Sequence, residues 1–202
     1  IDNSVELMTN TLEEMKEIVR EIQPVCDAFE VNLSCPHPRP GEKAGRALGS
    51  DPDAVLEFVK GLKSESRKPI IAKLSHSLDD LEESARACIK GGADAISTTN
   101  TIGPTDSWNS VTKWPVLSNK KGGLSGPGIK DKGLGSVRTI RRVDRSIPVI
   151  GMGGISSSGD VIDYIRAGAD AVAMGTAFDL MSTEKVGMFI NHIVRGLVDE
   201  ME

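Results

Sequence analysis

The stretch PIIAKLSHSLDDLEESARACIKGGADAIST, residues 69–98, decides the fold class. It holds two short apolar runs, 69–74 and 93–98, whose composition favours β-strands. Between them, residues 79–92 carry apolar side chains at helical spacing and end in two glycines, which stop a helix. Each apolar run is nearly continuous rather than alternating, which is typical of parallel strands. The stretch therefore predicts a strand–helix–strand unit of a parallel α/β protein.

The same unit repeats along the chain. Further apolar runs predict strands at 28–33, 147–152 and 169–175, which makes five strands in all. Helical spacing also predicts that Ile18 in the first helix and Ile190 in the last face the core. The predicted helices span residues 11–22, which begin with the capping box of Thr11 and Glu14, 50–62 with Pro52 in the first turn, 79–92, 158–167 and 183–200.

Polar residues and glycines gather where the predicted strands end. A doubly wound sheet is possible, but active sites of (β/α)8 barrels are built at the carboxyl ends of their strands, which favours a barrel. We therefore expect residues 1–202 to form a single domain, the last five strand–helix units of a (β/α)8 TIM barrel. About three strands would be missing upstream, with Ile1–Asp2 as the end of one. The strand-end residues are Asn32, Lys73, Asn100, Gly153 and Gly175.

The composition excludes several classes of protein. The net charge is −5 and the pI is near 5.3, so no basic stripe is available to bind nucleic acid. No apolar run is long enough to span a membrane, and we expect no signal peptide. Cys26, Cys35 and Cys88 are too widely spaced to form a metal-binding pair. The sequence predicts a cytoplasmic protein with no metal site.

Three side chains at strand ends are candidates for chemistry. Cys35, in VNLSCPHP (31–38), follows a strand and is either an acid/base at the mouth of a site or a small residue filling a gap. Lys73 sits inside an apolar strand, where it either reaches out to solvent or faces an anionic ligand. Asn100 is either a turn residue or an amide that pairs with the N–H and C=O groups of a heterocycle.

Two glycine turns follow the last two predicted strands. They are GMGGIS (151–156) and AMGTAF (173–178), and the second also offers the hydroxyl of Thr176. Glycines let backbone N–H groups approach a phosphate, and barrels commonly bind phosphate after strands seven and eight. The turns could also be plain tight turns. A third glycine-rich stretch, 120–130, is either a hairpin turn or a backbone that lies along a ligand.

Six motifs together resemble the dihydroorotate dehydrogenase family, in the same order and spacing from about residue 28 to 180. The closest similarity is to the cysteine-base branch, class 1 and especially 1B, and SCPH also resembles the flavin domain of dihydropyrimidine dehydrogenases. Orotate enzymes usually have asparagine where His37 stands. The motifs are NLSCPH, AKLS, TTNT, GGLSGPGIK, IPVIGMGGI and AGADAVAMGTA.

The resemblance implies an FMN-dependent barrel of pyrimidine biosynthesis. Cys35 would be the acid/base at C5 of a dihydropyrimidine while hydride passes between ring C6 and flavin N5, and Lys73 would face the flavin's N1/O2 edge. The resemblance also implies a homodimer, either alone or with an electron-transfer subunit. Substrate contacts would come from Asn32, His37, Asn100 and Thr101, and FMN contacts from Lys73, Gly126, Gly153, Gly154, Gly175 and Thr176.

Alternatives remain open from the sequence. The substrate could be dihydroorotate, which the resemblance favours, or dihydrouracil or dihydrothymine. A barrel lyase or aldolase would use Lys73 as a Schiff base and the same turns for a sugar phosphate. A non-catalytic binding subunit is a third alternative. The electron acceptor could be a partner subunit, fumarate or a nicotinamide cofactor.

Overall fold

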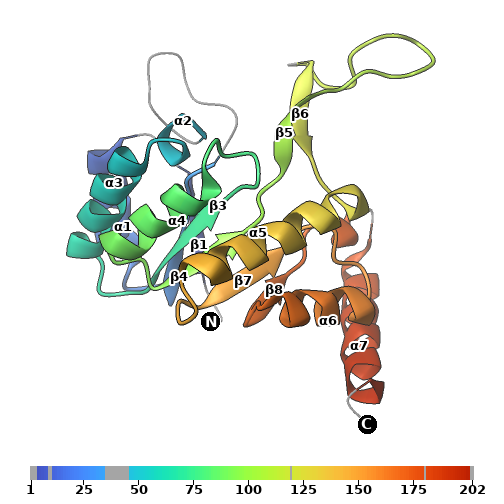
Figure 1. Cartoon of the computed structure of the whole chain (residues 1–202). Helices are drawn as coiled ribbons and strands as arrows, with labels where there is room; N and C mark the ends of the chain where they lie inside the picture. The colour runs from blue at the N-terminus through green and yellow to red at the C-terminus, as the bar shows by residue number, and fades with distance from the viewer. Residues whose placement is uncertain (1–3, 9–10, 35–45, 119, 180, 201–202) are drawn as a thin grey trace.

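Six parallel strands form one sheet in the computed structural model, which describes residues 4–8, 11–34, 46–118, 120–179 and 181–200. The sheet curls as an incomplete barrel would, with helices along its outer side (Figure 1). The parallel α/β class and the partial (β/α)8 barrel predicted from the sequence are confirmed. In sheet order, the strands are β1 (Ser4–Met8), β2 (Ala28–Asn32), β3 (Ile70–Leu74), β4 (Ala95–Thr98), β7 (Val149–Met152) and β8 (Ala171–Ala173).

The prediction of five strands in all is wrong, because the parallel sheet has a sixth strand, Ser4–Met8, and two further strands form a separate hairpin. Ser4–Met8 pairs in parallel with β2, in a register that sets Val5 beside Phe29. Its sequence, SVELM, alternates polar and apolar residues and lacks the continuous apolar run by which the other strands were identified. The alternation has a structural reason, since Leu7 belongs to the core whereas Ser4 lines a cavity on the other face. Residues 1–2, where the end of a strand was expected, lie outside the described residues.

The helices begin and end largely where local sequence predicts. Thr11 and Glu14 form the expected capping box of α1, and Asp51 caps α3 with Pro52 in its first turn. Gly92 ends α4 in the left-handed conformation that glycine favours. The helices are α1 (Leu12–Ile22), α2 (Arg46–Gly49), α3 (Pro52–Glu65), α4 (Leu81–Gly91), α5 (Lys130–Val143), α6 (Ser158–Ala167) and α7 (Thr183–Asp199), with 3₁₀ turns at Pro127–Ile129 and Thr176–Phe178.

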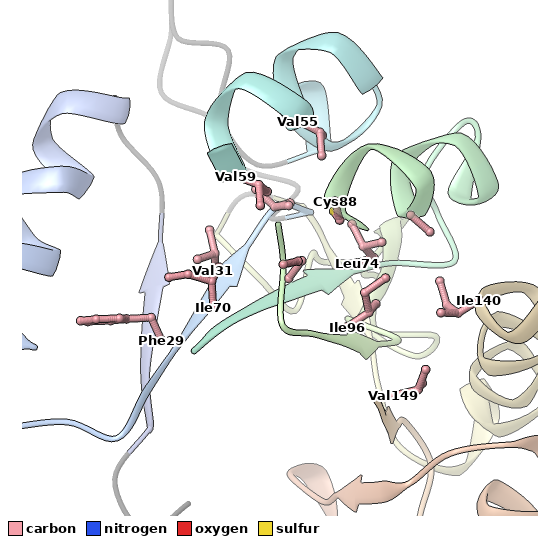
Figure 2. Close-up of a cluster of buried hydrophobic side chains, with 14 of the residues drawn as sticks. Phe29, Val31, Val55, Val59, Ile70, Leu74, Cys88, Ile96, Ile140 and Val149 are labelled. Carbon is pink, nitrogen blue, oxygen red and sulfur yellow. The ribbon is translucent and has the colours of Figure 1, made fainter. Parts of the chain in front are cut away.

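The core lies between the sheet and the helices on its outer side. Figure 2 shows Val31, Ile70 and Leu74 from the strands together with Val59 of α3 and Cys88 of α4. Each of these side chains is fully buried, which is worth about 1.5–3 kcal/mol for a large aliphatic residue. Burial also raises the pKa of Cys88 to about 12, so this cysteine is an inert core thiol.

An antiparallel hairpin stands away from the sheet and helices (Figure 1). It consists of β5 (Ile102–Asp106) and β6 (Lys121–Leu124). The stretch 120–130 therefore supplies a strand and then a 3₁₀ turn, not the hairpin turn that was one of its two interpretations. The hairpin leaves the barrel next to Asn100 and returns at Ser125, so both of its ends adjoin a cavity that these two residues line.

The helices at the two ends of the sheet are less covered than their sequences predict. Ile18 is 37% exposed and Ile190 is 41% exposed, so the prediction that they face the core is wrong. The reason is that α1 packs on α3 and α7 packs on α6, and each of them has a helical neighbour on one side within the described residues. Among those residues, no helix is long and apolar enough to cross a bilayer.

Candidate active site

A cavity of about 720 Å³ opens at the carboxyl ends of the strands. Pockets of about 300–1,000 Å³ are typical for small ligands and cofactors. The cavity reaches from Ser4 and Glu30 on the inner face of the sheet to the turns after β7 and β8. Eight of the eleven residues proposed from sequence for catalysis or binding line it: Lys73, Asn100, Thr101, Gly126, Gly153, Gly154, Gly175 and Thr176.

The two asparagines form one hydrogen-bonded cluster. The side-chain amide of Asn100 donates to Oδ1 of Asn32 and to Oγ of Ser34, with a donor–acceptor distance of 3.0 Å in each case. Oδ1 of Asn100 accepts a hydrogen bond of 2.8 Å from the backbone N–H of Thr101, and the backbone N–H of Ser34 donates to Oδ1 of Asn32. Asn100 lines the cavity, while Asn32 is 6% exposed and supports it from behind.

Lys73 enters the cavity as half of an ion pair. Its Nζ lies 2.9 Å from Oε1 of Glu30, and the two side chains are 14% and 17% exposed, respectively. Glu30 was not among the residues proposed from sequence, although a sequence pattern identifies it. It is a charged residue inside the apolar run AFEVNL, two positions before Asn32 and therefore on the same face of the strand.

The first glycine turn is required by backbone geometry. Gly153 and Gly154 have φ angles of +109° and +72°, which residues with a Cβ rarely adopt. A Cβ on Gly154 would also lie 2.9 Å from the backbone nitrogen of Lys130. Gly175, in the second turn, differs, because its φ is −127° and a Cβ there would meet nothing within 4 Å. Gly175 also lines the cavity.

A buried tyrosine holds the first turn from behind. The single O–H of Tyr164, in α6, is shared between the carbonyl oxygens of Met152 and Gly153, at O···O distances of 2.9 and 2.7 Å. Its ring is fully buried, and burial raises the pKa of its hydroxyl above the ordinary value. Gly133 and Gly151 leave room for the side chain, since a Cβ on either would lie less than 2.5 Å from it.

An ion-pair network fixes the helix that follows the turn. Nζ of Lys130, at the start of α5, lies 2.5 Å from Oδ1 of Asp160 and 2.8 Å from Oδ2 of Asp163. Hydrogen bonds with Asp160 and then Asp163 raise the pKa of Lys130. Burial would raise the pKa of Asp160, but hydrogen bonds from Lys130 and the backbone of Ser156 outweigh it and lower that pKa to about 2. Asp160 therefore remains a carboxylate beside the turn at neutral pH.

The remaining two residues proposed from sequence, Cys35 and His37, lie outside the described residues. The structure does describe Leu33 and Ser34, which directly precede Cys35. Ser34 is buried and contacts Asn100, so the chain leaves the described region beside the asparagine cluster. The acid/base role of Cys35 and the substrate contact of His37 stay predictions.

The comparison with known families identifies this arrangement. The model of the family described as dihydroorotate dehydrogenase matches residues 1–201. This chain belongs to the dihydroorotate dehydrogenase family. The resemblance that the six motifs predicted is thereby confirmed, and the carboxyl-end cavity occupies the place where barrel enzymes build their active sites.

The sequences of individual family members are similar to this chain over most of its length. The dihydroorotate dehydrogenase B (NAD(+)) catalytic subunit of Pyrococcus horikoshii is 40% identical over 196 residues, which are 97% of this chain and 63% of that protein. The subunit of the same name from Thermococcus kodakarensis is 40% identical over 87% of this chain and 57% of its own length. That from Oceanobacillus iheyensis is 42% identical over 75% of this chain and 48% of its own. The chain thus spans less than two thirds of the length of these relatives.

Proposed function

We propose that this chain carries the flavin and substrate site of an FMN-dependent oxidoreductase that interconverts dihydroorotate and orotate. The observation that supports this most is the single cavity joining Lys73 and Asn100 to the glycine turns after β7 and β8. Such a cavity offers a cation and a side-chain amide at one end and backbone donors for a phosphate at the other. Relatives named dihydroorotate dehydrogenase B add support for this substrate.

The residues of the cavity fit FMN, the flavin we propose within this flavin-dependent family. The positive φ angles of Gly153 and Gly154 keep that turn free of side chains, so its backbone can approach a phosphate closely. Gly175 leaves open space on the facing turn, and Thr176 adds a hydroxyl donor. When bound, FMN would supply N5 as the acceptor of the hydride from the dihydropyrimidine.

The chain's own residues would then bind, orient and exchange a proton with the substrate. The two N–H groups of the Asn100 amide bind Asn32 and Ser34, and its Oδ1 accepts from Thr101, so Asn100 would present the remaining lone pair of Oδ1 to a ring N–H of the pyrimidine. Lys73 would place a positive charge beside the flavin's N1/O2 edge. Cys35, just after Ser34, would take the proton from C5 as the general base.

The ion pair of Lys73 argues against the lyase or aldolase alternative. A Schiff-base lysine reacts as a neutral amine, which enzymes obtain by an apolar pocket or a neighbouring cation. Lys73 instead lies 2.9 Å from the carboxylate of Glu30, which favours the charged ammonium. A fixed positive charge suits a residue that acts on a bound anion.

Partners and location form part of the proposal. The matched relatives are named catalytic subunits with NAD(+), which supports an electron-transfer partner that passes electrons from the flavin to NAD⁺. We propose a homodimer of the catalytic chain as its core. Buried free thiols at Cys26 and Cys88 are in keeping with a reducing, cytoplasmic compartment.

The test is the spectrum and reactivity of the purified protein. We expect flavin absorbance bands, release of FMN on denaturation, and anaerobic bleaching of the bands by dihydroorotate. Bleaching by dihydrouracil or dihydrothymine alone would assign the substrate to the alternative that His37 suggests. A protein that binds sugar phosphates and no flavin would overturn the proposal.

A further inference from the structure

Glu30 and Lys73 are diagonal neighbours on two adjacent strands. In the parallel register of β2 and β3, Glu30 stands beside Ile71 and Lys73 stands beside Asn32. Residues two apart on a strand share a face, so the two charged side chains project on the same side, and diagonal pairs of long side chains can touch. Their 2.9 Å contact lies in the cavity, on the face opposite Val31 and the core.

The fold does not explain this ion pair. Both side chains are mostly removed from water, and desolvating two charges cancels much of what their attraction gains. Apolar residues of similar volume commonly stabilise such a position at least as well. The pair nevertheless occurs between strands whose opposite face is a continuous apolar core. Its position in the cavity therefore indicates a role toward a ligand.

The two charges act on a bound ring in opposite directions. Among the described residues that line the cavity, Glu30 and Lys73 are the ones with charged side chains. A flavin ring is neutral when oxidised and anionic when reduced at neutral pH. Lys73 therefore favours the reduced form, whereas Glu30 opposes it. An ammonium has three N–H donors, and the contact with Glu30 fixes the direction of one of them.

We infer that Glu30 is a positioning residue that orients the ammonium of Lys73 in the cavity and offsets its charge, and thereby sets the reduction potential of the bound flavin. This inference rests on the proposed FMN site. It assigns to Glu30 a function that the sequence motifs did not suggest. Its consequence is that the potential depends on the balance of the pair rather than on Lys73 alone.

The experiment compares four FMN-loaded proteins: wild type, Glu30→Gln, Lys73→Gln and the double variant with both changes. Midpoint potentials are measured anaerobically against reference dyes, with FMN dissociation constants for the oxidised form alongside. We expect the potential of Glu30→Gln to lie above wild type and that of Lys73→Gln to lie below it. A tenfold change in the relative affinity for reduced and oxidised flavin is about 30 mV for a two-electron couple, and we expect at least that for Glu30→Gln.

The double variant keeps the test decisive even if Glu30→Gln alone does not fold. It replaces the ion pair by two neutral amides, so its potential should return close to wild type. A Glu30→Gln protein with the wild-type potential, or a double variant with the potential of Lys73→Gln, would overturn the role of Glu30. If Glu30→Gln does not fold, the second comparison decides. A wild-type protein that binds no flavin would instead overturn the proposed function, and the inference with it.

Discussion

The hydroxyl of Tyr164 lies 2.7 Å from the carbonyl oxygen of Gly153. Through this contact α6 holds the turn that follows β7 in the conformation that exposes its backbone to the cavity. The same hydroxyl lies 2.9 Å from the carbonyl of Met152, so one buried side chain fixes two successive peptide units. The first glycine turn is therefore positioned by a residue that does not itself line the cavity.

Tyr164→Phe should weaken phosphate binding in particular. The change leaves the carbonyls of Met152 and Gly153 without this donor, which costs about 1–3 kcal/mol of unfolding free energy for a buried group. We expect the dissociation constant of FMN to rise by about tenfold, which corresponds to about 1.4 kcal/mol. Riboflavin, which lacks the phosphate, should lose much less affinity in the same fluorescence titration. An equal loss for both ligands would show that the turn does not hold the phosphate.

Gly175→Ala should weaken ligand binding and leave the stability of the fold unchanged. A Cβ at this position meets no protein atom within 4 Å, so the unfolding free energy should stay within about 0.5 kcal/mol of wild type. Because Gly175 lines the cavity, we expect the added methyl group to crowd a bound phosphate, and FMN affinity should fall by at least about tenfold. The matched control is Gly187→Ala, because Gly187 is an exposed helical glycine of α7 that also has open space around it. Unchanged FMN affinity in Gly175→Ala would move the phosphate away from this turn.

Asn100→Ala should weaken the binding of the pyrimidine and leave FMN binding unchanged. The change removes the amide that Asn32 and Ser34 orient, and one lost hydrogen bond to a desolvated ligand costs about 1–3 kcal/mol. The dissociation constant of orotate, followed by its perturbation of the flavin spectrum, should rise about 10- to 100-fold. Asn109→Ala is the control, since Asn109 is an exposed turn residue on the hairpin. Wild-type orotate binding in Asn100→Ala would return Asn100 to a structural role.

Acid should destabilise the protein in part through Asp160. Its pKa is about 2 in the folded protein against an ordinary value of 3.8, so its ionised form stabilises the fold. That contribution is complete above about pH 3.8 and is lost as the pH falls toward 2, and after solvent screening it amounts to about 1 kcal/mol. Urea unfolding between pH 5 and 2.5 should show a shallower loss of stability in Asp160→Asn. Asp199→Asn, at the exposed end of α7, should follow wild type, and a parallel curve for Asp160→Asn would contradict the assignment.

Cys35→Ala should bind FMN and orotate normally but react slowly. Loss of a general acid/base typically slows a reaction about 100- to 10,000-fold. Anaerobic stopped-flow reduction of the flavin by dihydroorotate measures that step directly. Cys35→Ser should keep part of the rate, shifted to higher pH because a hydroxyl is a weaker acid than a thiol. A wild-type rate in Cys35→Ala would make Cys35 a small loop residue without a chemical role.

The sequence by itself determined the class of the fold and the ends of most of its elements. Continuous apolar runs identified five of the six parallel strands, and Thr11, Pro52 and Gly92 marked helix ends correctly. These features are local, because a cap or a strand face is set by residues a few positions apart. The glycine turns were also visible, since positive φ angles at Gly153 and Gly154 require that residue type.

Only the tertiary structure decided which of these residues act together. Asn100 contacts Asn32 across 68 positions, and Lys130 contacts Asp160 across 30. Lys73 likewise pairs with Glu30 through the alignment of β2 and β3, which neither strand's sequence specifies alone. The strand Ser4–Met8 was missed for the same reason, because its alternating sequence acquires meaning only between a core and a cavity. The local sequence pattern shows which face of a helix or strand is apolar. Which distant residue contacts a side chain on the polar face is decided by sheet register and helix packing.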